Sequence, residues 1–85
     1  MYRLRLSKRA EKDLDRLQGD TFERVRDALN DLRQNPRPRG CVKLERIGAY
    51  RIRIGDYRAI YDVDDKAQIV MVLRVKHRRE VYRES

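Results

Sequence analysis

The stretch Tyr50-Arg-Ile-Arg-Ile-Gly-Asp-Tyr-Arg-Ala-Ile-Tyr61 decides the fold of this chain. On both sides of Gly55-Asp56, isoleucine and tyrosine alternate with arginine at a period of two residues, which is typical of half-buried β-strands. A glycine in a two-residue loop can adopt the positive φ that a hairpin turn needs. We therefore predict a β-hairpin in which the residues flanking the loop pair, so that Arg53 lies opposite Arg58.

The two faces of this hairpin differ in character. Arg51 shares a face with Arg53 and Arg58, and directly opposed like charges destabilise a strand pair. Their placement therefore indicates that an anion binds between them. The opposite face is apolar and is expected to pack on the rest of the chain; it carries Tyr50, Ile52, Ile54, Ala59, Tyr61 and Val63.

Length and composition restrict the class of protein. With 85 residues, the chain is expected to form a single domain over residues 1–85 with one modest core. Its 22 Lys+Arg and 14 Asp+Glu give a net charge of +8, which favours nucleic acid, an anionic membrane surface or an acidic protein as partner. The sequence has no apolar run of membrane-spanning length and no signal-peptide stretch, so we expect no membrane partner. Cys41 is the only cysteine and His77 the only histidine, so we expect no disulfide, no metal, no cofactor and a cytoplasmic location.

The N-terminal part predicts one strand followed by two helices. Alternation over residues 2–6 predicts the strand, and Ser7 is a suitable N-cap for the first helix. Gly19 is expected to end that helix, and Asp20 with Glu23 predicts a capping box that opens the second. Each helix has one apolar stripe, formed by Ala10, Leu14 and Leu17 in the first and by Phe22, Val25, Leu29 and Leu32 in the second.

The remaining segments predict a sheet. The prolines in Asn35–Gly40 end the second helix in a loop, and Cys41–Leu44 is a candidate short extended piece. After the hairpin, Asp64–Lys66 is a polar turn, and the apolar run Gln68–Val75 predicts a central strand covered on both sides. The economical architecture is α+β, an antiparallel β-sheet with an N-terminal helical hairpin packed on one face in the order β-α-α-β-β-β.

The strand after the turn adds cations to the arginine face. Arg74 and Lys76 share a parity, and Arg78 continues it if the chain stays extended. Guanidinium groups can bind phosphate oxygens through two parallel hydrogen bonds, so this face predicts a phosphate-binding surface. The alternative is that these side chains simply form the solvated side of the sheet.

The C-terminal segment offers a proton acceptor. If Arg78 and Tyr82 lie in one helical turn, their side chains meet at i, i+4 spacing. Neighbouring cations would lower the pKa of the Tyr82 phenol below about 10, which favours a role as general base. Packing of Tyr82 on the sheet edge is an equal alternative. His77 is the rival proton donor, but its parity favours a spacing role or a backbone contact.

Three segments resemble the RelE branch of the RelE/ParE toxin superfamily. They are Lys43-Leu44, the hairpin sequence of residues 50–61 and Val-Lys-His-Arg-Arg-Glu-Val-Tyr at residues 75–82. The predicted element order is also similar, so the resemblance covers essentially the whole chain. It implies the toxin of a type II toxin–antitoxin pair, a metal-independent endoribonuclease (mRNA interferase) that cuts messenger RNA in the ribosomal A site and inhibits translation. In such enzymes the 2′-hydroxyl attacks the adjacent phosphate.

The resemblance also implies roles for individual residues. The basic pair of the family falls on Arg51 and Arg53, and the arginine that steadies the transition-state phosphate falls on Arg58. The arginine near the leaving oxygen matches Arg78, and the tyrosine base matches Tyr82. The catalytic set is thus Arg58, Arg78 and Tyr82, and the expected RNA-binding set is Arg51, Arg53, Arg74, Lys76 and His77.

Partners and competing functions follow from the same comparison. We expect a RelB-like antitoxin, bound in a hetero-oligomer, that covers the basic face or adds a strand to an open sheet edge. One alternative is a ParE-like inhibitor of DNA gyrase, which shares the fold but needs no such catalytic set. A second is a non-catalytic RNA-binding module that uses the same arginine surface.

Overall fold

The predicted hairpin forms β3 (Ala49–Ile54) and β4 (Tyr57–Asp64) in a computed structural model that describes residues 1–80. Its register is the predicted one, with Arg53 opposite Arg58. Gly55 has a φ of +59°, a conformation that glycine adopts at little cost. The apolar alternation and the turn residue were therefore sufficient to predict this pairing.

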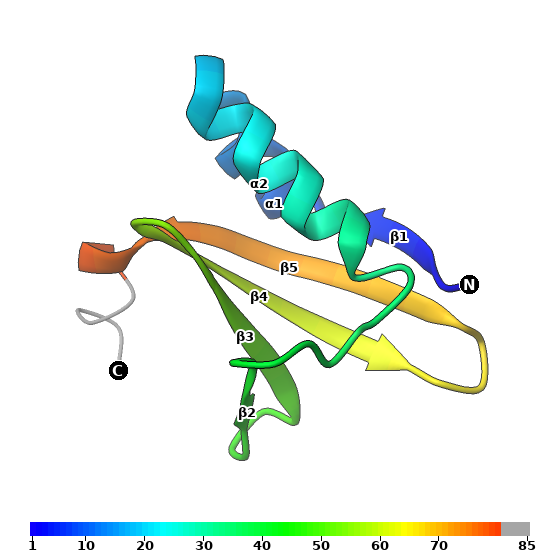
Figure 1. The fold of residues 1–85 in the computed structure, drawn as a ribbon. Coiled ribbons are helices and arrows are strands. Elements are labelled where there is room, and N and C mark those ends of the chain that lie inside the picture. Colours follow the sequence, from blue (N-terminus) through cyan, green and yellow to red (C-terminus); the bar gives the residue numbers. More distant parts are fainter. Residues whose placement is uncertain (81–85) are drawn as a thin grey trace.

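The sheet has five strands in the order β1-β5-β4-β3-β2 (Figure 1). β1 (Arg3–Leu6) and β2 (Val42–Leu44) are its edges, and β5 (Ile69–His77) lies between β1 and β4. The α+β class is confirmed, but one pair differs from the predicted antiparallel arrangement, because β1 runs parallel to β5. Side-chain alternation is the same for both directions, and the long connection between these two strands allows the parallel one.

Both helices, α1 (Lys8–Asp15) and α2 (Gly19–Asp31), lie over the same face of the sheet in Figure 1. The Ser7 cap is confirmed, because its Oγ accepts a hydrogen bond from the backbone nitrogen of Ala10 at 3.0 Å. None of the helices that the structure describes is long and apolar enough to cross a membrane.

The predicted capping box of α2 is wrong. The N-cap residue is Gln18, which makes no side-chain cap hydrogen bond, and the helix begins at Gly19 with a φ of +56°. Glycine thus reverses the chain at the helix start, and Asp20 falls inside the first turn. There its carboxylate is favoured by the helix dipole rather than by a cap.

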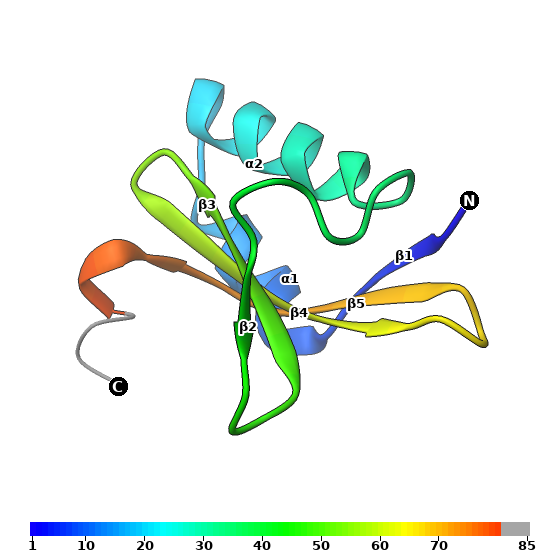
Figure 2. The ribbon, with the colours of Figure 1, turned by 60° about the horizontal axis from the view of Figure 1, so that its bottom comes forward.

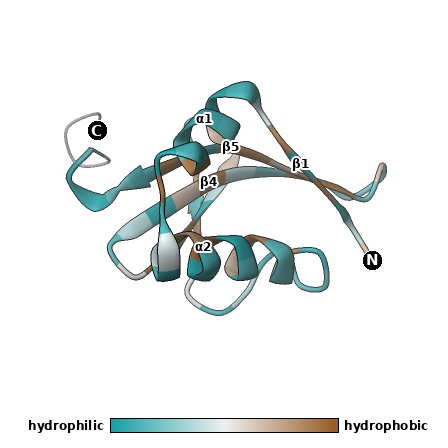
Figure 3. Ribbon diagram, turned by 90° about the horizontal axis from the view of Figure 1, so that it is seen from above, coloured by the Kyte–Doolittle hydropathy of each residue, from teal (hydrophilic) through white to brown (hydrophobic). Residues whose placement is uncertain are grey.

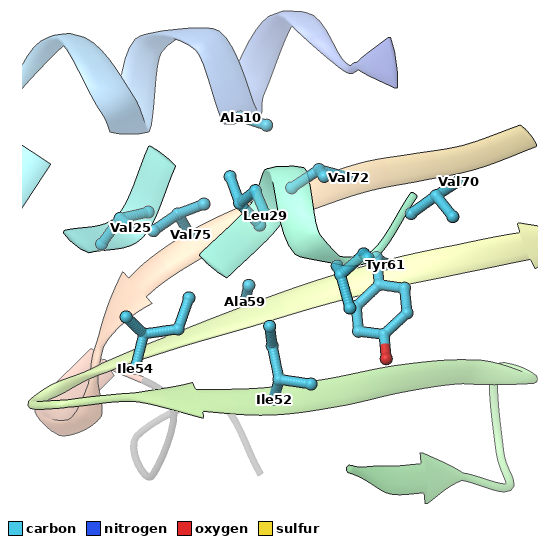
Figure 4. Close-up of a cluster of buried hydrophobic side chains, with 11 residues drawn as sticks. Ala10, Val25, Leu29, Ile52, Ile54, Ala59, Tyr61, Val70, Val72 and Val75 are labelled. Atoms are coloured by element: carbon cyan, nitrogen blue, oxygen red, sulfur yellow. The ribbon is translucent and has the colours of Figure 1, made fainter. Parts of the chain in front are cut away.

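The core lies between the helices and the sheet, as Figure 4 shows. In Figure 3, β5 is brown, and thus hydrophobic, along the part that follows the β4–β5 turn, and it becomes teal toward its C-terminal end. The side chains predicted to face the helices all belong to this core or pack against it, which confirms the predicted sheet face. The buried members are Ala10, Val25, Leu29, Leu32, Ile52, Ile54, Ala59, Tyr61, Val70, Val72 and Val75.

Tyr61 anchors the loop that follows α2. Its ring is fully buried, and its hydroxyl donates a hydrogen bond of 2.7 Å to the carbonyl oxygen of Pro36. Burial of this phenol raises its pKa above the ordinary value. Arg37, the next residue in the loop, makes two hydrogen bonds with the Asp65 carboxylate in the β4–β5 turn. The loop is therefore fixed against the end of the sheet.

Replacing Tyr61 by phenylalanine is expected to lower the free energy of unfolding by about 1–3 kcal/mol, since the buried Pro36 carbonyl loses its donor. Urea unfolding measures the change. Tyr2→Phe is the matched control, because the Tyr2 hydroxyl bonds to Asp65 at an exposed position. A Tyr61→Phe protein as stable as the wild type would contradict this role.

One edge of the sheet is only partly covered. β2 pairs with β3 from Ala49 to Arg51, and Figure 2 shows β3 continuing past it toward the turn. In a two-residue hairpin the flanking pair is hydrogen bonded, and hydrogen-bonded pairs alternate with non-bonded ones. The backbone polar groups of Arg53 therefore point away from β4, to the part of the edge that no strand among residues 1–80 covers.

Candidate functional site

A row of three cations crosses the middle of the sheet. Arg53 of β3 lies opposite Arg58 of β4, which lies opposite Lys76 of β5. Directly opposed residues point to one face, and the neighbouring Ala59 and Val75 belong to the core, so the row lies on the face turned away from the helices. Arg53 is exposed and Arg58 half-buried, whereas Lys76 is only 2% exposed. The structure thus places these cations together, with Lys76 beneath the surface.

The next row of residues across the sheet is not part of the cation row. Arg51, half-buried on β3, lies opposite Ile60, which lies opposite Arg74 on β5. Arg74 is paired with the Asp13 carboxylate of α1, through Nε at 2.8 Å and Nη2 at 3.2 Å. The parity of Arg74 on the strand is as predicted, but its guanidinium is directed to a helix instead of to the other arginines.

Asp13 is a residue that the sequence analysis missed. It is 8% exposed and also accepts a hydrogen bond of 2.9 Å from the backbone nitrogen of Val75. Burial raises the pKa of the Asp13 carboxyl, but the hydrogen bonds from Arg74 and Val75 outweigh it, so that this pKa lies below its usual value. The available signal was its spacing, because Asp13 falls on the same helical stripe as Ala10 and Leu17.

The β3–β4 turn joins two residues of the predicted catalytic set. Arg58 Nη1 donates to the carbonyl oxygens of Gly55 at 3.2 Å and Tyr57 at 2.9 Å. The backbone nitrogen of Arg78 donates to the carbonyl oxygen of Asp56 at 2.7 Å. Sequence reasoning placed these arginines on one face, and the structure adds that the same turn contacts both of them.

The C-terminal part of the site is described as far as residue 80. Residues 78–80 are helical, and the Arg78 side chain is exposed. His77 lies opposite Tyr57 with the two rings edge to face at 5.3 Å, and its Nδ1 accepts a hydrogen bond from the backbone nitrogen of Arg79 at 3.3 Å. Tyr82, the predicted base, lies outside the described residues.

One groove lies beside this site and not within it. It has a volume of about 590 Å³, runs between the end of α2, the loop and β3, and shares only Arg53 with the cation row. Its lining includes Ala28, Leu32, Pro38, Arg39 and Ile52. Within residues 1–80, no group of three or more His, Cys, Asp or Glu side chains could hold a metal ion. The cation row itself consists of two guanidinium groups, from Arg53 and Arg58, and the ammonium group of Lys76.

Comparison with known proteins identifies the class to which this fold and site belong. Residues 4–82 match the sequence model of the family described as the ParE toxin of type II toxin–antitoxin system, parDE. The chain therefore belongs to the RelE/ParE family of toxins of type II toxin–antitoxin systems.

Individual relatives narrow the comparison to the RelE branch. Toxin RelG of Mycobacterium tuberculosis is 34% identical over 84 residues, which cover 96% of this chain and 97% of RelG. The RelE–RelB complex from Pyrococcus horikoshii contains a chain with a TM-score of 0.81 and 35% identity, covering 91% of this chain and 94% of that one. The isolated RelE toxin of E. coli has a TM-score of 0.80 and 28% identity, with coverage of 99% and 94%. The resemblance predicted from the sequence is confirmed.

Proposed function

We propose that this toxin is an endoribonuclease that inhibits translation by cutting messenger RNA in the ribosomal A site. The observation that carries the proposal is the contact of both Arg58 and Arg78 with one turn at the end of a basic sheet face. A single phosphate placed there would meet one cation from β4 and one from the segment that directly follows β5. The kinship with RelE toxins gives the same reaction class additional support.

The reaction needs charge stabilisation and proton transfer. The 2′-oxygen of the RNA forms a bond to the adjacent phosphorus, and the bond from phosphorus to the 5′-oxygen breaks. Arg58 stabilises the charge that builds on the non-bridging oxygens, and Arg78 stabilises the leaving 5′-oxygen electrostatically, because a guanidinium does not release its proton. Tyr82, in its phenolate form, accepts the proton of the 2′-hydroxyl, and the departing 5′-oxygen takes up a proton from water. The 2′-hydroxyl is what distinguishes RNA from DNA.

The remaining cations differ in their proposed parts. Arg51 and Arg53 hold the RNA backbone, since they lie on the same sheet face as Arg58. Lys76, the buried member of the row, contributes positive charge, and His77 positions the strand end through its contact with Tyr57. We leave Arg74 out of the RNA-binding set, because its guanidinium is paired with the Asp13 carboxylate.

The proposed partner is a RelB-like antitoxin. The archaeal relative was crystallised as a RelE–RelB complex. A net charge of +8 suits an acidic or amphipathic polypeptide, and the uncovered edge of β3 offers backbone groups to an added strand. We accordingly propose a cytoplasmic toxin–antitoxin hetero-oligomer in which the antitoxin competes with RNA for the basic face.

Tyr82→Phe is expected to lower the cleavage rate by about 10²-fold or more, because it removes the hydroxyl that serves as base. Primer extension on messages from translating ribosomes, after brief induction of the toxin, measures the cuts. Tyr2→Phe is the control, since it deletes a phenol hydroxyl that bonds to Asp65 at the other end of the sheet. Undiminished cleavage by Tyr82→Phe would remove the base assignment but leave the arginine roles intact.

A gyrase poison is the second candidate, because the matching family model carries the ParE description. It predicts loss of DNA supercoiling activity of gyrase while messages stay intact. A third outcome, RNA binding without cutting that weakens steeply with salt, would identify a simple binding module. A supercoiling assay and the primer-extension assay on the same wild-type protein separate the three.

A further inference from the structure

The turn between β3 and β4 uses consecutive carbonyl groups to hold the proposed site. The carbonyl oxygens of Gly55 and Tyr57 lie 3.2 and 2.9 Å from Arg58 Nη1. The Asp56 carbonyl oxygen, between them in the chain, lies 2.7 Å from the backbone nitrogen of Arg78. The turn therefore contacts one arginine through its side chain and the other through its main chain.

The direction of these carbonyl groups depends on the conformation of Gly55. Its φ is +59°, which β-branched residues adopt only with strain and asparagine adopts readily. A Cβ atom added to Gly55 would lie 3.7 Å from Arg24 Nη1, an ordinary contact distance, so there is room for a side chain. A substitution at this position therefore acts through the backbone conformation and not through a clash.

The bonds to the turn also orient the guanidinium of Arg58. Only Nη1 donates to the turn. Nε and Nη2 have no hydrogen-bond partner among the residues that the structure describes. A guanidinium is planar and rigid, so fixing one nitrogen by two bonds fixes the direction of the other two. Those two nitrogens form the edge that can bind phosphate oxygens through parallel hydrogen bonds.

The same turn sets where the C-terminal segment starts. Arg78 directly follows β5, and Tyr82 comes four residues later in the sequence. The hydrogen bond from the Arg78 nitrogen to Asp56 fixes the point at which the segment leaves the sheet. A displaced turn would therefore move Arg58 and Arg78 relative to each other.

We infer that the Gly55-Asp56 turn is a positioning element for RNA cleavage, which sets the geometry between the Arg58 guanidinium and the segment that begins at Arg78. This inference rests on the proposed nuclease function. Gly55 and Asp56 are positioning residues and not catalytic ones, because they act through the arginines that they hold. Catalysis by aligned groups is sensitive to displacements of about 1 Å, so a change in the turn should lower the rate more than the binding.

The first test compares three variants in single-turnover cleavage on translating ribosomes. Gly55→Val is expected to lower the maximal rate by about 10–100-fold. The concentration of translating ribosomes that gives half the maximal rate should stay unchanged, because RNA is still bound but misaligned. Gly55→Asn should cut at the wild-type rate, since asparagine keeps the turn conformation. Gly48→Val is the matched control: Gly48 also has a positive φ, +68°, with open space around its Cβ position, but it lies in the turn before β3. A Gly48→Val rate as low as that of Gly55→Val would show general strain and overturn the inference.

A second measurement does not depend on activity. Amide hydrogen exchange should show the Arg78 N–H protected in the wild type and in Gly55→Asn, and unprotected in Gly55→Val. If the wild-type protein cuts no RNA, the proposed function fails, while these exchange data still decide whether the turn holds Arg78. If Gly55→Val loses the Arg78 protection but cuts at the wild-type maximal rate, the inference fails and the nuclease function stands.

A further variant covers the case in which Gly55→Val does not fold. Ligation of synthetic segments 1–40 and 41–85 at Cys41 allows an ester to replace the backbone N–H of Arg78 with every side chain retained. This ester should lower the maximal rate without changing half-saturation. An ester at Arg79 is the control, because that N–H donates a hydrogen bond to the neighbouring His77 ring at 3.3 Å. Equal rates for the two esters would overturn the inference.

Discussion

Arg58→Ala is expected to slow messenger RNA cleavage by about 10²–10³-fold, the usual cost of removing one preorganised donor to a developing charge. The cost is large because the Arg58 guanidinium is held by the Gly55 and Tyr57 carbonyl groups before any RNA binds. No reorganisation is then needed during the reaction. Primer extension at translating ribosomes measures the rate, and relief of growth arrest should accompany the loss.

Two further variants make this result specific. Arg58→Lys should recover little activity, because an ammonium bound to the turn has no second edge for phosphate. Arg26→Ala deletes an exposed arginine of α2 and should cut RNA like the wild type, which controls for the loss of one positive charge. Cleavage by Arg58→Ala at the wild-type rate would remove Arg58 from the site.

Asp13→Asn is expected to lower the free energy of unfolding by about 3 kcal/mol, because it breaks a buried charge pair. Asparagine keeps the shape of the side chain but loses the charge that pairs with Arg74 at 2.8 Å. It also weakens the acceptor for the Val75 N–H. Urea unfolding measures the loss. Asp15→Asn, an exposed change on the same helix, should have little effect.

The loss should also depend on pH in a defined direction. The pKa of Asp13 is lower in the folded protein than in the unfolded chain, so the carboxylate stabilises the fold fully above about pH 4. That contribution disappears as the pH falls through the folded pKa. The stability gap between wild type and Asp13→Asn should therefore be widest at neutral pH and close in acid. A gap of constant size would mean that Asp13 acts through shape and not through charge.

The sequence predicted the central hairpin well, because two independent signals agreed there. Apolar alternation defined the buried face, and Gly55 defined the turn, so a shift of one residue would have exposed every core side chain. The register that brings Arg53 opposite Arg58 follows directly from those two facts. The fold class followed from this, because the helices and the sheet each have one apolar face, and packing the two faces together buries both.

The remaining features depend on contacts that no local pattern encodes. Parity placed Arg74 among the cations, but its pairing with Asp13 joins residues far apart in the sequence. The parallel direction of β1 is set by tertiary packing, since alternation is the same for both directions. The hydrogen bond from Arg78 to the Asp56 carbonyl involves only backbone atoms, which the sequence does not distinguish. The proposed catalytic roles of Arg58, Arg78 and Tyr82 stay predictions.

The short reach of β2 affects how this protein can be handled in isolation. Past Arg51, β3 presents backbone groups that another chain could pair with. The exposed charge of Arg53 opposes such edge-to-edge strand pairing. Neutralising Arg53 to weaken RNA binding therefore also removes a safeguard against self-association. For any such variant, loss of activity should be interpreted only after light scattering has shown that the protein is still monodisperse.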